Sequence, residues 1–214
     1  MLQAVLTALV LAGSACGTGE SDTTVSDPGS SPSSSPSSSA PAMPVPDGLV
    51  GTRGLATVMD EGAGTVELCL GPVAESYPPQ CGGPPIAGWD WADHDGTYDE
   101  QGRVRWGSYA LTGDWDGATF TATDAVSGAL YDPAAPLPSP TPAAATSYPD
   151  TELESIAEEL RDTLPGYLGA YGGEGTDGHV LADVYYDDGS LQEWADSTYG
   201  QDVVIVSGAL VDAG

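Results

Sequence analysis

The sequence contains no lysine and only four arginines, against 32 aspartates and glutamates, so its formal net charge is −28. A surface of this sign repels a phosphate backbone, and it excludes polybasic adhesion to anionic lipid. Nucleic acid is therefore not an expected partner, whereas cations, basic proteins and neutral ligands are. The acid excess also has a plainer explanation, because it keeps an exposed protein soluble.

Residues for recognisable catalysis are also scarce. The only two histidines are His94, which lies among carboxylates in a predicted loop, and His179, which begins a predicted strand. Neither accompanies a nucleophile in a recognisable elbow, and the chain has no P-loop, Rossmann fingerprint or Cys/His metal spacing. We therefore predict no catalytic residue, no cofactor and no enzymatic activity. A carboxylate-dependent glycan hydrolase is kept as a remote alternative, since the sequence cannot select one acidic pair among so many.

The apolar run at residues 2–12 is too short to span a bilayer but has the length of the hydrophobic region of a secretory signal. It is followed by Gly13-Ser-Ala-Cys16, which resembles the lipobox of bacterial lipoproteins. By this resemblance residues 1–15 are a signal peptide, and Cys16 carries fatty acyl chains of the palmitate type. The protein would then be lipid-anchored in the cell membrane at its extracellular face. An ordinary cleaved signal with an incidental cysteine is the alternative.

Only three cysteines are present, and an exported chain is expected to pair two of them. Cys69 and Cys81 are close in sequence, and lipidation accounts for the third sulfur. Closing a loop of this size stabilises a fold by about 3 kcal/mol in the chain-entropy estimate. We therefore predict a Cys69–Cys81 disulfide.

Two stretches have almost nothing to bury. Residues 16–47 are mainly Ser, Pro, Gly, Thr and Asp, which predicts a disordered tether. Residues 132–146 are rich in Pro and Ala, which predicts a semi-rigid linker. Two folded domains are predicted on either side of that linker, at 48–131 and 147–214.

The first domain has short runs of alternating and β-branched residues, which predict strands rather than helices. On the longest run Tyr109, Leu111 and Trp115 share one face, and Asp116-Gly117 is a hairpin signal. Five short strands without a helical pattern favour a small, partly open, OB-like barrel, with a β-sandwich as the alternative. The predicted strands are 49–59, 65–70, 86–91, 104–115 and a fifth that begins at 118.

The second domain alternates between helical and strand patterns. Thr151-Glu-Leu-Glu154 has the form of a capping box, and apolar residues at helical spacing follow it to Leu164. Strands at 167–171, 179–186 and 202–211 and a helix at 191–199 complete the order α-β-β-α-β, expected as one sheet covered by two helices. This order resembles the prodomain units of secreted actinobacterial serine proteases. The resemblance implies a folding chaperone or protease inhibitor.

Four aromatic residues are candidates for ligand binding: Trp89, Trp91, Trp106 and Tyr109. In a strand over residues 86–91 the first two would share one face, and aromatic side chains on a barrel face can stack on a ligand. A neutral sugar or an apolar peptide suits the charge of the chain better than a nucleic acid. The alternative is that these side chains form the core, because the chain has a single Phe.

The acidic loop after these residues is a candidate for loose Ca²⁺ binding through Asp93, Asp95 and Asp99. It does not follow the EF-hand pattern, because Gly96 comes too early in the loop. No metal site is therefore predicted, and a solvated turn is the simpler interpretation.

The chain also carries longer motifs: Pro-Pro-Gln-Cys-Gly-Gly-Pro at 78–84, Gly-Trp-Asp-Trp at 88–91 and Trp-Gly-Ser-Tyr at 106–109. Together they resemble an uncharacterised family of actinobacterial secreted proteins and lipoproteins. The resemblance implies a location and a fold but no chemistry. The sequence thus predicts a membrane-anchored extracellular lipoprotein that acts as a non-catalytic binding or envelope-interaction module. Its expected partner is an envelope protein or a glycan, and a prodomain-like inhibitor is the alternative.

Overall fold

The computed structural model describes residues 40–132, 143, 144 and 146–214. The predicted signal peptide, Cys16 and most of both predicted linkers lie outside these residues. The described part contains ten strands and two α-helices, so the predicted β-rich α+β class is confirmed. The strands are β1 (Val50–Thr52), β2 (Ala56–Asp60), β3 (Val66–Cys69), β4 (Ile86–Ala87), β5 (Asp99–Gln101), β6 (Val104–Trp115), β7 (Phe120–Ser127), β8 (Tyr167–Gly172), β9 (Val180–Tyr186) and β10 (Val204–Asp212). The helices are α1 (Asp150–Thr163), α2 (Ser190–Tyr199) and a short 3₁₀-helix, Trp91–His94.

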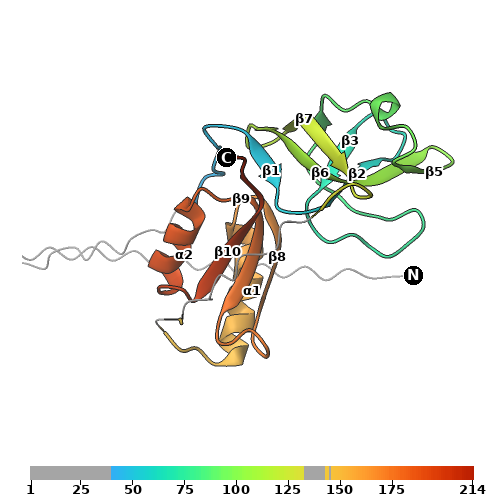
Figure 1. Ribbon diagram of the computed structural model, residues 1–214. Helices are drawn as coiled ribbons and strands as arrows, with labels where there is room; N and C mark the ends of the chain where they lie inside the picture. The colour runs from blue at the N-terminus through green and yellow to red at the C-terminus, as the bar shows by residue number, and fades with distance from the viewer. Residues whose placement is uncertain (1–39, 133–142, 145) are drawn as a thin grey trace, which may run out of the picture. The chain divides into compact units, whose positions relative to one another are not determined.

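All ten strands belong to one sheet, whose main path runs β3-β2-β6-β1-β10-β9-β8 (Figure 1). The sheet has a first half, β2 to β7, and a second half, β8 to β10. Strand β1 connects them, because it pairs antiparallel with β6 on one side and with β10 on the other. In the second pairing Val50 lies opposite Asp212. The two segments that the sequence analysis assigned to separate domains therefore share one sheet, and all described residues lie in a single compact unit.

Strand β6 organises the first half of the sheet. It pairs antiparallel with β1, β2, β5 and β7, while β4 pairs parallel with β7. The odd-numbered side chains Tyr109, Leu111 and Trp115 point into a buried core that also contains Phe120, as the alternating pattern predicted. Two residues of the second half, Tyr186 and Leu210, belong to the same core, and β1 lies beside the strand that supplies Leu210.

The predicted strand over 49–59 is instead two strands. Val50 is opposite Gly113 and Ala56 is opposite Tyr109, so the chain has two residues more than an uninterrupted antiparallel register allows. The extra residues loop out at Arg53-Gly54-Leu55. This departure lets β1 pair with β10 while β2 pairs with β3.

The predicted strand over 86–91 ends at Ala87. Gly88 has a positive φ of 74°, and the Asp90 carboxylate accepts a hydrogen bond from the Ala92 amide at 2.9 Å, which begins the 3₁₀-helix. Trp89 and Trp91 consequently do not alternate along a strand. The acidic loop contains a further strand, β5, which the sequence analysis did not predict.

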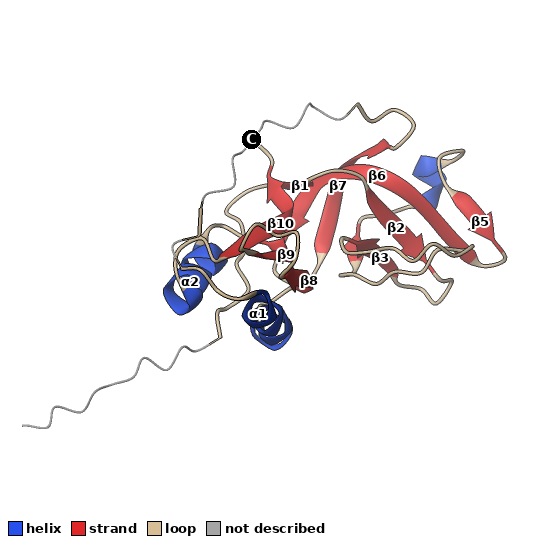
Figure 2. Ribbon diagram, turned by 90° about the horizontal axis from the view of Figure 1, so that it is seen from below, coloured by secondary structure: helices blue, strands red, loops and turns tan. Residues whose placement is uncertain are grey.

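The second half has the predicted order of elements, α1-β8-β9-α2-β10. Strands β9 and β10 are parallel, β8 and β9 are antiparallel, and α1 and α2 lie on the same side of these three strands (Figure 2). The helices bury their apolar faces against Val180, Ala182 and Val184 of β9. No helix in the described ranges is long and apolar enough to cross a membrane.

The two helices begin differently from one another. Gly189 occupies the N-cap position of α2, and Asp187 Oδ1 accepts hydrogen bonds from the amides of Gly189 and Leu191, each at 2.9 Å. The predicted capping box of α1 is wrong, because Pro149 occupies the N-cap position and Thr151 already lies in the first turn. The extended backbone of Pro149 starts this helix without a side-chain cap.

Residues 40–47, which the sequence analysis assigned to the disordered tether, have a defined path along the fold. Pro44 is buried, and Met43 is half-buried. A Cβ atom built on Gly117 would lie 3.2 Å from Val45 and 3.6 Å from Met43, so this segment packs closely on the β6–β7 turn. The folded region therefore begins several residues before the predicted boundary.

Candidate functional site

The aromatic residues predicted to bind a ligand are packed inside the fold. Tyr109 is fully buried, Trp91 and Trp106 are 7% and 8% exposed, and Trp89 is half-buried. The Trp89 ring stacks on His94 at 3.9 Å between centroids and meets the Tyr109 ring edge-on at 4.8 Å. The structure thus brings Trp89, Trp91 and Tyr109 together as one side of the first core.

Trp106 is not part of that group. It lies an odd number of residues from Tyr109 on β6 and therefore faces the other side of the sheet. There it packs with Met59 and the Cys69–Cys81 disulfide, in which the two Cα atoms are 5.8 Å apart. The predicted disulfide is confirmed, and Trp106 is part of its packing.

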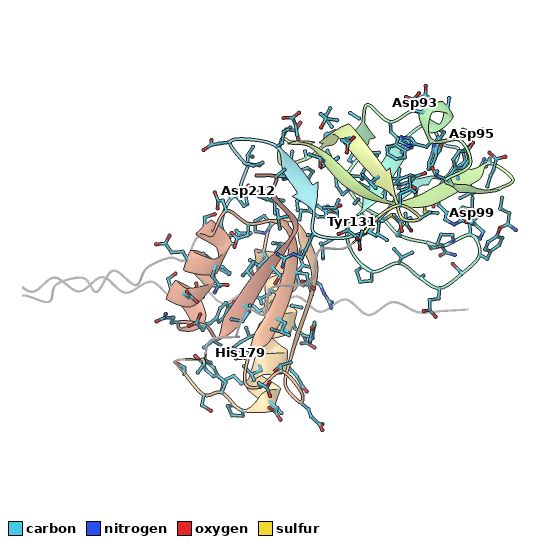
Figure 3. All side chains as sticks on the ribbon, in the orientation of Figure 1. Asp93, Asp95, Asp99, Tyr131, His179 and Asp212 are labelled. Atoms are coloured by element: carbon cyan, nitrogen blue, oxygen red, sulfur yellow. A yellow bond between two sulfur atoms is a disulfide. The ribbon has the colours of Figure 1, made fainter. Side chains whose placement is uncertain are left out.

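The acidic candidates Asp93, Asp95 and Asp99 are all exposed (Figure 3). Asp93 lies in the 3₁₀-helix, whereas Asp99 is the first residue of β5, so the two residues belong to different secondary-structure elements. Within the described ranges, no three His, Cys, Asp or Glu side chains are grouped closely enough to hold a metal ion.

Both histidine side chains make contacts within the fold. His179 is buried at the start of β9, and its Nδ1 lies 2.7 Å from the carbonyl oxygen of Asp202. The amide of Asp202 in turn donates to the Asp196 carboxylate of α2 at 2.9 Å, so the ring is part of a network that joins β9, β10 and α2. His94 is held by its stacking on Trp89.

The described residues form a groove of about 700 Å³. It lies on the face of β8, β9 and β10 opposite to the helices, since its floor residues alternate with those that contact the helices. The 53–57 turn and the 69–73 segment form its remaining walls. Five separate parts of the chain therefore build it.

Small side chains form the floor of the groove. Gly169, Asp183 and Ser207 stand opposite one another on β8, β9 and β10 and so point to the same face. A Cβ atom built on Gly169 would meet no other atom within 4 Å, which shows that the space above it is open. The Asp183 side chain is exposed in this space and has no salt-bridge partner among the described residues.

Apolar side chains stand around the rim. Tyr171 is 58% exposed, Leu55 is 48% exposed and Val73 is 37% exposed. On the inner wall, a Cβ atom on Gly71 would come within 3.1 Å of Leu168, so the 69–73 segment packs directly on β8. Exposed apolar residues gathered around one concavity are typical of a binding site.

Arg53 closes the groove at the β10 side. Its Nε donates to the carbonyl oxygen of Gly208 at 2.8 Å, and its amide donates to that of Ala209 at 2.8 Å. The side chain thus fixes the looped-out turn between β1 and β2 onto the sheet. The guanidinium is exposed and makes no salt bridge with a described residue.

A second, smaller hollow of about 280 Å³ lies beside Tyr186, Asp188 and Asp212. The buried Tyr186 hydroxyl donates to Asp212 Oδ1 at 2.7 Å. Burial, reinforced by this hydrogen bond and by the charge of Asp212, raises the pKa of Tyr186 to about 12. Burial and the nearby Glu159 likewise raise the pKa of Tyr199 to about 12.

We expect the protein to lose stability as the pH rises from about 10 to about 12. An unfolded tyrosine has a pKa of about 10, so in this range the unfolded chain releases protons that folded Tyr186 and Tyr199 retain, and unfolding becomes more favourable. Urea denaturation across this pH range measures the effect, and the near-ultraviolet absorbance of tyrosinate reports the titration. Tyr186→Phe should flatten the dependence. An unchanged slope in that variant would contradict the assignment.

Comparison with models of protein families, with curated proteins and with solved structures gives no match for this chain. Its function must therefore be argued from the groove itself. Sequence reasoning did not find the groove residues Gly169, Asp183 and Ser207. The available signal was weak: small or charged residues replace the large apolar ones expected on the second face of three predicted strands.

Proposed function

We propose that this chain is a lipid-anchored extracellular protein whose folded region is a non-catalytic binding module, and that the groove over β8–β10 holds its ligand, an envelope protein or a glycan. The observation that carries the proposal is the open floor around Gly169 within an apolar rim. A neutral or basic ligand fits the net charge of −28.

Filling the groove tests this function. Gly169→Leu is expected to weaken retention of an envelope component by about tenfold or more, because it places a side chain where the ligand lies. The backbone at Gly169 has an ordinary φ, so the substitution should leave the unfolding temperature unchanged or higher. Retention is measured by passing envelope extract over the immobilised chain and quantifying bound protein and bound sugar separately.

Gly82→Leu is the matched control, because a Cβ atom there also meets nothing within 4 Å but the residue does not line the groove. It should retain the same component as the unchanged chain. Equal retention by Gly169→Leu and the unchanged chain would contradict the proposed site. Absence of any specifically retained component would contradict the proposed function.

The lipid anchor rests on the Gly13-Ser-Ala-Cys16 motif. Intact-mass analysis of protein from its native host should show a chain that begins at Cys16 with added acyl mass. An unmodified Cys16 would contradict the anchor and leave the groove proposal to its own test.

The proposal includes an OB-like barrel for the first half of the sheet. Its support is the curl of β2, β3, β6 and β7 around one core, with β4 added parallel to β7. An experimental structure in which these strands form two stacked sheets would favour the β-sandwich instead.

The order α-β-β-α-β of the second half supports a second candidate function, inhibition of a secreted serine protease in the manner of a prodomain. Titration of the whole chain against secreted serine proteases tests it. Unchanged protease activity at excess chain would exclude it.

A further inference from the structure

Strand β8 is the last strand of the main sheet path, so its outer edge has no strand beside it in the described residues. Free edges carry unpaired amide and carbonyl groups that can pair with another chain, and natural proteins usually protect them. Three other open parts of this sheet are protected: β3, β5, and residues 204–206 of β10, which lie outside its pairing with β1. The contrast between those edges and β8 is informative.

Side chains or irregular backbone cover two of the other edges. At β3, the amide of Leu68 donates to the carbonyl oxygen of Pro84 at 2.9 Å. At β10, Gln192 of α2 takes the place of a neighbouring strand: its Nε2 donates to the Val204 carbonyl oxygen at 2.8 Å, and its Oε1 accepts from the Val206 amide at 2.9 Å. Strand β5 ends the sheet with exposed acidic residues, Asp99 and Glu100, which discourage pairing.

Strand β8 has no charged or covering side chain among the described residues, and its register against β9 shifts once, between Tyr167 and Gly169. Its sequence, Tyr-Leu-Gly-Ala-Tyr-Gly, contains no charge and no proline. Four of its residues, 168–171, also line the groove. A strand added at this edge would therefore run along the groove and bring its own side chains over the floor.

The register indicates which side chain would suit the floor. Gly169 lies between the free edge and Asp183, because it is the β8 residue opposite Asp183. An added strand would lie two strand spacings from β9, about 9.6 Å. A long basic side chain from that strand can cross above Gly169, where nothing blocks it within 4 Å, and approach the unpaired Asp183 carboxylate.

Charge selects the source of the strand. A second copy of this chain would bring another net charge of −28 and be repelled, whereas a basic polypeptide would be attracted. Arg53 is held at the opposite, β10 side of the groove by Gly208 and Ala209, away from the β8 edge.

The geometry points to an extended, basic segment of a partner polypeptide as the ligand: it pairs with the free edge of β8 as a further strand and places a Lys or Arg side chain over Gly169 against Asp183. This inference rests on the proposed function, since it names the ligand class of the same groove. It belongs to the general mode of recognition in which backbone hydrogen bonds supply affinity and side-chain pockets supply specificity.

The test uses a synthetic library of heptapeptides with a central Lys and alternating Val and Thr at varied flanking positions, titrated into the full chain by calorimetry. Binding should protect the amides of β8 from hydrogen exchange. The tightest peptide should lose about tenfold or more in affinity when its alternate amides are N-methylated, because each lost backbone bond costs about one kcal/mol. Replacing its Lys with Gln should cost about two- to fivefold, as for an exposed ion pair.

Protein variants test the contribution of the Asp183 charge separately from that of backbone pairing at the β8 edge. Asp183→Asn should weaken the Lys peptide by the same two- to fivefold factor and leave the Gln peptide unchanged, whereas Asp124→Asn on β7 should alter neither. The inference is overturned if no library member binds, if N-methylated peptides bind equally well, or if Asp183→Asn weakens both peptides equally. If no peptide binds while Gly169→Leu still abolishes envelope retention, the groove remains the proposed site and only the strand ligand is wrong.

Discussion

Replacing Tyr109 with alanine is expected to lower the free energy of unfolding by about 3–5 kcal/mol, the cost typical of removing a buried aromatic ring. Tyr109 is fully buried on the longest strand, and its ring contacts those of Trp89 and His94. Its loss would open a cavity that the flanking strands cannot close. Urea denaturation measures the effect as a lower midpoint at an unchanged slope.

Two controls accompany this variant. Tyr109→Phe keeps the ring and loses only the hydroxyl contacts to the Thr97 carbonyl oxygen and to Thr97 Oγ1, each at 3.1 Å, so it should cost about 1 kcal/mol. Tyr171→Ala, at an exposed position, should cost less than about 1 kcal/mol. If Tyr109→Ala kept full stability but lost ligand binding, the aromatic residues would be a binding face after all.

Removing the disulfide by the double substitution Cys69→Ala and Cys81→Ala is expected to cost about 3 kcal/mol. The two cysteines are 12 residues apart, and opening a loop of this length restores that much chain entropy to the unfolded state. Cys69 is also buried against Met59 and Trp106, so the free ends of the loop would loosen their packing. Thermal and urea unfolding of the purified double variant measure the loss.

Reduction of the unchanged chain is the matched control. A strong thiol reductant should lower its stability to that of the double variant, while the double variant itself should not respond. If reduction left the unchanged chain as stable as before, the bridge would contribute nothing measurable. The predicted cost would then be wrong.

Local pattern accounts for much of the fold. The helical spacing of Leu153, Ile156 and Leu160 placed α1 almost to the residue, and strict alternation placed Tyr109 and Trp115 on the core face of β6. These predictions succeed because a helix face or a strand face is defined by neighbours in the sequence. The same parity also separates Trp106 from Tyr109, which the sequence analysis had grouped as one candidate site.

Features set by distant partners could not be predicted in this way. Residues 49–59 are strand-like throughout, and the break at Arg53 follows from its contact with Gly208, 155 residues away. The groove combines Leu55, Val73, Tyr171 and Asp183 from four separate segments. No local pattern records which of these segments meet, so the site became visible only with the fold.

The pairing of β1 with β10 determines how the fold would respond to a mechanical pulling force. Val50 at the start of β1 lies opposite Asp212 near the end of β10, so a pull that separates these two positions acts across the ladder. The backbone hydrogen bonds between β1 and β10 would then break one after another, rather than bear the load together in shear. Force applied at the C-terminal end should separate β10 from β1 at low force. Force applied along β8 would instead load all of its hydrogen bonds to β9 at the same time.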